Sequence, residues 1–123
     1  MKVKKIKIGI RSVKDVFSDV KDTVNKIEAG QRLKPVTEPE MYFTSLEAFR
    51  KVLTPKRLEL LHIIKTEHPS SVNELARMAK RDIKNVTADV KYLEQIGLIE
   101  KKATGHKIKP VINYDKIALE IAV

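Results

Sequence analysis

A chain of 123 residues can bury one hydrophobic core and one small accessory element, so we do not expect two full domains. The hydrophobic fraction is 42% and aromatic residues make up only 5%, which indicates a globular core of aliphatic side chains rather than a disordered chain. Lysine and arginine number 25 against 16 acidic residues, and the net charge of +9 favours a polyanionic partner.

The amino-terminal part predicts a strand followed by a helix. Apolar residues alternate at positions 6, 8 and 10, the period of a half-buried strand. Ser12 can cap a helix that ends at Gly30 and carries one apolar stripe. Pro35 and Pro39 then mark residues 31–40 as a linker. The stripe consists of Val13, Val16, Phe17, Val20, Val24 and Ile27.

The central part predicts three helices in succession. Residues 44–47 have capping-box spacing and open a short helix with Leu46, Phe49, Val52 and Leu53 on its apolar side. Residues 54 and 55, a threonine cap and a proline, open a longer helix that ends at residues 68 and 69. A second capping box at 71–74 opens another short helix.

The remaining elements complete a recognisable order. Asp82 can cap a helix that ends at Gly97, with Ile83, Val86, Val90 and Leu93 turned inward. Two extended runs, 98–100 and 108–112, flank a basic tip that contains Gly105 and so form a hairpin. We therefore expect an α+β, mainly α fold: a winged helix-turn-helix with an amino-terminal strand-helix extension. The expected division is 1–40 for the extension and linker and 41–123 for the winged helix-turn-helix.

Four segments of this order carry a family resemblance: LTPKRLELL (53–61), VNELAR (72–77), NVTADVKYLE (85–94) and GLI (97–99). As an ordered set they resemble MarR-like winged helix-turn-helix transcriptional regulators. More narrowly, they are similar to a family of small archaeal and bacterial DNA-binding regulators, some of which are considered antitoxins. The resemblance implies sequence-specific binding of duplex DNA by a homodimer that represses transcription.

The helix that follows Asp82 is the candidate recognition helix. At 100° per residue its outward face combines lysine, asparagine, threonine and alanine, which can contact guanine, adenine and the thymine methyl group in the major groove. The alternative is an ordinary solvated face. Asp89 cannot favour DNA if it points outward, so we assign it to a cap or an ion pair. The candidate residues are Lys84, Asn85, Ala88, Lys91 and Gln95, with Thr87 on the flank.

Two further basic groups can contact the DNA backbone. The first surrounds the hairpin tip and could grip phosphates or the minor groove, although a charged tip also keeps a sheet edge soluble. The second precedes the recognition helix and could contact phosphate or simply be solvated. The wing residues are Lys101, Lys102, His106, Lys107 and Lys109; the phosphate candidates are Arg77, Lys80 and Arg81.

The sequence offers little support for catalysis, for a metal or cofactor site, or for a membrane-spanning segment. There is no cysteine, and the three histidines lack carboxylate partners at metal-ligand spacing, so we expect no metal, no cofactor and no enzyme activity. No apolar stretch approaches the roughly 20 residues that span a bilayer, so we expect a cytoplasmic protein.

The amino-terminal unit must cover its apolar stripe. A second copy of the chain is the favoured partner, because a twofold dimer matches a palindromic operator. Alternatively the unit binds a toxin, so that the protein is an antitoxin that regulates its own operon. The lysines at positions 2, 4, 5 and 7 could also form a nucleic-acid arm, and a sequence-neutral chromatin or RNA-binding protein would need the same charge.

Overall fold

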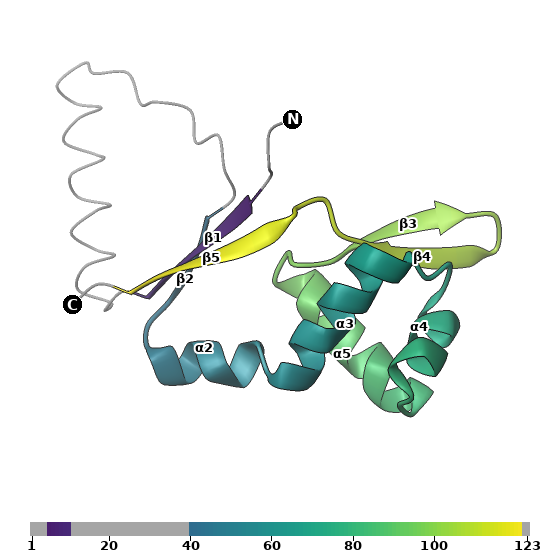
Figure 1. The fold of residues 1–123 in the computed structure, drawn as a ribbon, viewed down its shortest axis with the longest axis horizontal. Helices are drawn as coiled ribbons and strands as arrows, with labels where there is room; N and C mark the ends of the chain where they lie inside the picture. Colours follow the sequence, from purple (N-terminus) through teal and green to yellow (C-terminus); the bar gives the residue numbers. More distant parts are fainter. Residues whose placement is uncertain (1–4, 11–39, 122–123) are drawn as a thin grey trace, which may run out of the picture. The chain divides into compact units, whose positions relative to one another are not determined.

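The computed structural model describes residues 5–10 and 40–121 (Figure 1). The helix predicted over 12–30, with its apolar stripe, lies outside the described residues. The chain divides into two units, one of residues 1–52 with 114–123 and one of residues 53–113. The boundary expected between residues 40 and 41 took no account of a strand at the carboxyl end, which joins the first unit.

The first unit contains a three-stranded parallel sheet of order β2-β1-β5, formed by β1 (Lys5–Ile10), β2 (Glu40–Phe43) and β5 (Lys116–Ile121). The strand predicted at residues 6, 8 and 10 is confirmed as β1, and all three isoleucines are buried. A Cβ atom on Gly9 would lie 2.9 Å from the Tyr42 ring, so a larger residue would force that ring to move.

The first unit also contains the short helix α2 (Leu46–Val52). The capping box predicted over 44–47 does not form as expected, because the cap is Ser45 rather than Thr44: the Ser45 hydroxyl accepts a hydrogen bond from the Ala48 amide at 3.1 Å. Phe49 packs edge to face on Phe43 of β2 at 5.7 Å between ring centroids. Leu46 was expected on the apolar side, but it is exposed because it opens the helix.

The second unit has the order helix, helix, helix, hairpin: α3 (Pro55–Glu67), α4 (Val72–Ala79), α5 (Ile83–Gln95), β3 (Glu100–Thr104) and β4 (Lys107–Val111) (Figure 1). The predicted caps are confirmed, since the side chains of Thr54, Ser71 and Asp82 each accept a hydrogen bond from the first turn of their helix. The core lies between these helices and the hairpin. Its most deeply buried side chains include Leu60, Leu75, Val86, Leu93, Leu98 and Ile99.

Two turns set the geometry of this winged helix-turn-helix. Lys80 ends α4 in the left-handed conformation, with φ of 55°, and residues 80–82 lead directly into α5. Thr104 pairs with Lys107, which leaves Gly105 and His106 as a two-residue hairpin turn. Gly105 has φ of 62° while His106 has no positive φ, the combination of a type II′ turn, whose twist suits a hairpin. No described helix is long and apolar enough to cross a membrane.

Candidate nucleic-acid interface

The outward face of α5 is the centre of the candidate interface. The inward side predicted from the helical period is confirmed for Val86, Val90 and Leu93, all of which are buried. Ile83 was expected inward and is 41% exposed, because it is the first helical residue and lies a turn ahead of the core. The opposite side exposes Lys84, Asn85, Ala88, Lys91 and Gln95, and Thr87 is half-buried on the flank.

Asp89 lies on α5 but does not present its charge outward. Its Oδ1 accepts from Arg57 Nε of α3 at 3.1 Å, and its Oδ2 accepts from an Arg81 Nη atom in the turn at 2.8 Å. Arg57 also lies over the Tyr92 ring, 4.3 Å from its centroid. The ion pair predicted for Asp89 is therefore confirmed, and it ties α5 to both α3 and the turn.

The other acidic groups on or beside α5 are also engaged within the unit. Asp82 accepts from the Lys84 amide at 2.8 Å as the helix cap. Glu94 pairs with Lys101 of β3 at 2.7 Å, and Glu100 accepts from the Asn113 amide group at 2.6 Å. Each of these acids thus has a partner from the chain itself.

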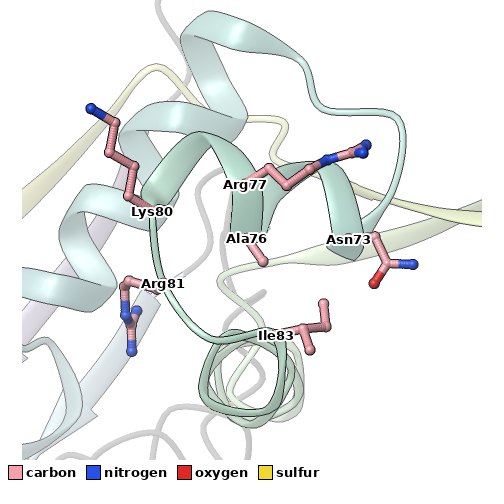
Figure 2. Close-up of a pocket in the computed structure, with 6 residues that line it drawn as sticks. All are labelled: Asn73, Ala76, Arg77, Lys80, Arg81 and Ile83. Carbon is pink, nitrogen blue, oxygen red and sulfur yellow. The ribbon is translucent and has the colours of Figure 1, made fainter.

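A shallow hollow of about 600 Å³ lies between α4 and the start of α5 (Figure 2). Figure 2 shows side chains from α4, from the turn and from the first residue of α5 around it. Arg77 and Lys80 are exposed here, whereas the Arg81 side chain is only 18% exposed and is held by Asp89. The hollow is lined by Asn73, Ala76, Arg77, Lys80, Arg81 and Ile83.

The hairpin places its lysines on two different faces. Lys102 of β3 pairs directly with Lys109 of β4, so both side chains lie on the same face. Lys107 lies two residues before Lys109 on β4 and therefore shares that face. Lys101 pairs with the buried Pro110 on the other face, where it meets Glu94. Like charges directly opposite each other destabilise a hairpin, so the three-lysine face has unfavourable electrostatics when no anion is present.

Glu74, at the start of α4, is an acidic group whose pKa is affected by Lys107 of the wing. A hydrogen bond from the Ser70 hydroxyl at 2.6 Å is the main cause that lowers its pKa, and Arg77 and Lys107 lower that pKa further. The predicted capping box is half formed, because the Glu74 amide donates to Ser71 at 3.1 Å while the Glu74 carboxylate turns to Ser70.

The predicted site residues therefore fall into two classes. The structure brings the exposed residues of α5, the hollow and the wing into one unit, but it gives Arg81 and Lys101 partners inside the protein. Asn73 and Ile83 line the hollow and were not predicted, because each has the spacing of an ordinary helix residue. Among the described residues no cluster of three or more histidine, aspartate or glutamate side chains could hold a metal ion.

Comparison with known proteins gives one family and distant solved structures, among them the two that follow. A family model described as HVO_A0114 matches residues 52–119, more than half of the chain. No curated protein matches the chain significantly. The homodimeric winged helix-turn-helix DNA-binding domain of a possible ArsR-family transcriptional regulator from Mycobacterium bovis is 22% identical, with a TM-score of 0.46; the match covers 50% of this chain and 57% of that one.

A MarR-like transcriptional regulator from Thermotoga maritima is 17% identical, with a TM-score of 0.46, over 83% of this chain and 65% of that one. The chain thus spans less than two thirds of the length of either solved structure.

Proposed function

The chain belongs to the HVO_A0114 family, and we propose that it is a sequence-specific regulator of transcription that binds double-stranded DNA through α5 and the wing. The family description states no function, so the proposal rests on the site. The order of α3, α4, α5 and hairpin supports it, because in winged helix-turn-helix proteins the third helix enters the major groove.

One observation carries the proposal: the acids of α5 are engaged within the protein, while its polar outward side chains are not. Asp82, Asp89 and Glu94 all have intramolecular partners. Within the described residues, no hydrogen bond or ion pair engages the side chains of Lys84, Asn85, Lys91 or Gln95. The face is therefore left with donors and positive charge, which suits the negative potential of a DNA groove.

The chemistry of the outward face favours base recognition over simple charge attraction. Asn85 can pair bidentately with adenine, and Lys84 can donate to guanine O6 and N7. Ala88 and the Thr87 methyl group can contact a thymine methyl group. A helix with these side chains on one side can read adenine and thymine as well as guanine, whereas lysine and arginine alone read mainly guanine.

The hollow and the wing supply phosphate contacts in this proposal. Arg77, Lys80 and Asn73 line or border the hollow beside the start of α5, where a DNA backbone would run next to the groove that α5 enters. The three-lysine face of the wing, Lys102, Lys107 and Lys109, would gain an anion that offsets its own repulsion. We leave Arg81 out of the phosphate contacts because it is paired with Asp89. We expect Lys101 to contribute less to phosphate binding than the other wing lysines because it is paired with Glu94.

The proposal includes repression by a homodimer. Two copies double the contacts and match a palindromic operator, and a protein bound over a promoter blocks transcription without further chemistry. The stripe from Val13 to Ile27 is one proposed dimer surface. Replacing Val16 and Val20 of this stripe with aspartate would then weaken the dimer and half-site binding while keeping β1, the central strand of the sheet, in the chain. Light scattering and a binding titration can measure both effects.

Selection from random DNA duplexes tests the proposal. We expect the protein to enrich a recurring short motif, and the Asn85→Ala variant to enrich that motif less strongly or with one position relaxed. Thr66→Ala, an exposed change on α3, serves as the matched control and should enrich the parent motif. Enrichment of no motif by the parent protein would contradict base recognition.

A further inference from the structure

The outer edge of β5 is open within the described part of the chain. In the order β2-β1-β5 this strand has β1 on one side and no described strand on the other. Its exposed side chains include Leu119 at 41% and Ile121 at 50%, while Ile117 and Ala118 are half-buried. An edge strand with exposed apolar residues is a template for pairing with another strand, and proteins guard such edges unless they use them.

The sequence of β5, KIALEI, is self-complementary in the antiparallel direction. If two copies pair about a twofold axis at Ala118, Lys116 of each copy lies opposite Glu120 of the other. Ile117 of each copy likewise lies opposite Leu119 of the other. Within residues 116–120 every directly opposed pair is therefore either an opposite-charge pair or an apolar pair, while Ile121 lies opposite Asp115, just before the strand.

We propose that a second copy of this chain pairs with β5 edge to edge, so that two three-stranded sheets become one six-stranded sheet in a homodimer. The inference does not rest on DNA binding, since it concerns the protein alone. The surface is distinct from the stripe of residues 13–27.

Other registers fit less well. A slip by one residue would place Ile117 opposite Glu120 and Lys116 opposite Ile121, because the faces of a strand alternate with each residue. Placing the axis at Leu119 pairs apolar residues, but it sets Ala118 opposite Glu120 and gives Lys116 no acidic partner. Only the axis at Ala118 pairs both charged residues of the strand.

Contacts inside the subunit leave these charges available. Glu120 pairs with Lys7 of β1 at 3.2 Å, but its side chain remains 65% exposed and can accept a second donor. Lys116 stands in register with Lys5 of β1, so two like charges lie side by side within the subunit. An acidic group from a second copy would relieve that repulsion.

Pairing at β5 also bears on the DNA-binding unit. Residues 112–115 alone separate β4 from β5, so a short stretch of chain joins the unit of residues 53–113 to the strand that forms the proposed interface. A dimer formed at β5 would hold two such units in one assembly.

A charge-swap experiment tests the proposal with the full chain and without DNA. Lys116→Glu sets Glu opposite Glu twice in its own homodimer, and Glu120→Lys sets Lys opposite Lys twice. We expect each variant alone to dimerise about tenfold more weakly than the parent, as measured by sedimentation equilibrium. In a heterodimer of the two variants, residue 116 of each copy again lies opposite a residue 120 of opposite charge. We therefore expect an equimolar mixture to form heterodimers, which native mass spectrometry detects when one variant is labelled with nitrogen-15.

Lys116→Glu separates assembly from folding, whereas Glu120→Lys also removes the ion pair with Lys7 inside the subunit. Lys116→Glu places an acid beside Lys5, so the subunit itself should be no less stable, which thermal unfolding at low concentration will check. Lys56→Glu, the same charge change in the first turn of α3, is the matched control and should dimerise as the parent does. A monomeric parent protein, or single variants that dimerise as tightly as the parent, would overturn the proposal.

Discussion

Asp89 is the acidic residue in the middle of α5, and its carboxylate is bound by two arginines from other parts of the unit. Its negative charge is therefore neutralised and does not reduce the positive charge on the outward face of α5. Its side chain is only 17% exposed, and those of Arg57 and Arg81 are 19% and 18% exposed. Removing the carboxylate from such a group leaves two arginine charges that water reaches poorly. The loss of folding stability is therefore larger than for an ion pair on the surface.

We expect Asp89→Asn to lower the free energy of unfolding by about 2 kcal/mol, because two half-buried arginines lose their counter-charge. Urea unfolding of the parent and the variant measures this difference. Asp82→Asn is the matched control, since asparagine caps a helix about as well as aspartate. Equal midpoints for Asp89→Asn and the parent would show that the arginines do not depend on this carboxylate.

Asn85 tests base recognition at the level of one side chain. We expect Asn85→Ala to weaken binding to the preferred duplex by about 1 to 3 kcal/mol while binding to random DNA stays the same, as for the loss of a base contact. Fluorescence titration with both duplexes measures the two affinities. A loss of equal size on both duplexes would assign Asn85 to the backbone instead.

Tyr114 gives the protein a predicted weakness at high pH. Burial raises the pKa of its hydroxyl group above the usual value, so the folded state disfavours the phenolate. The stability that this burial contributes is full below pH of about 10 and falls as pH rises beyond it. We expect Tyr114→Phe to unfold at a higher pH than the parent in an alkaline titration followed by circular dichroism; an unchanged midpoint would contradict this.

Among the elements, the wing separates two kinds of lysine that the sequence presents as one cluster. Lys107 lies on the three-lysine face, whereas Lys101 lies on the opposite face and pairs with Glu94. Periodicity along two strands and the register of the hairpin together determine this split. The sequence alone could predict the hairpin from Gly105 but not which lysines an acid of α5 would engage.

We expect Lys107→Ala to weaken binding to specific and random duplexes alike and to make the slope of log affinity against log salt shallower by about 0.9. Lys101→Ala is the matched control and should change that slope much less, because Glu94 already neutralises this lysine. Salt titrations of both variants measure the slopes. Equal slopes for the parent and Lys107→Ala would place the wing away from the DNA.

The helices were predictable because their signals are local. Caps at Thr54, Ser71 and Asp82 mark where α3, α4 and α5 begin, and the positive φ of Gly97 fits its predicted place after α5. The ion pair of Arg81 with Asp89 was not predictable, since a basic residue before a recognition helix can equally contact a DNA phosphate or an acid eight residues later. The helical period likewise could not predict that Ile83 is exposed, because it is the first residue of α5 and lies ahead of the core, beside the hollow.

At the scale of the whole molecule, the strand pairing was the part that the sequence did not reveal. β5 follows the wing by only four residues, 112–115, yet it pairs in parallel with β1 from the other end of the chain. Local alternation can predict that a segment is extended, but it carries no information on a partner more than a hundred residues away. The same pairing leaves the β5 edge open for the proposed second copy.

Binding of duplex DNA in competition with single-stranded RNA tests the central claim most directly. The full-length protein is titrated onto a labelled duplex at several salt concentrations, and unlabelled RNA of the same length is then added. We predict that the duplex binds more tightly than the RNA throughout and that its affinity falls steeply with salt, by about 0.9 in slope for each phosphate neutralised. RNA that binds as tightly as the duplex, or a duplex affinity that does not change with salt, would contradict the assignment of α5 and the wing to duplex DNA.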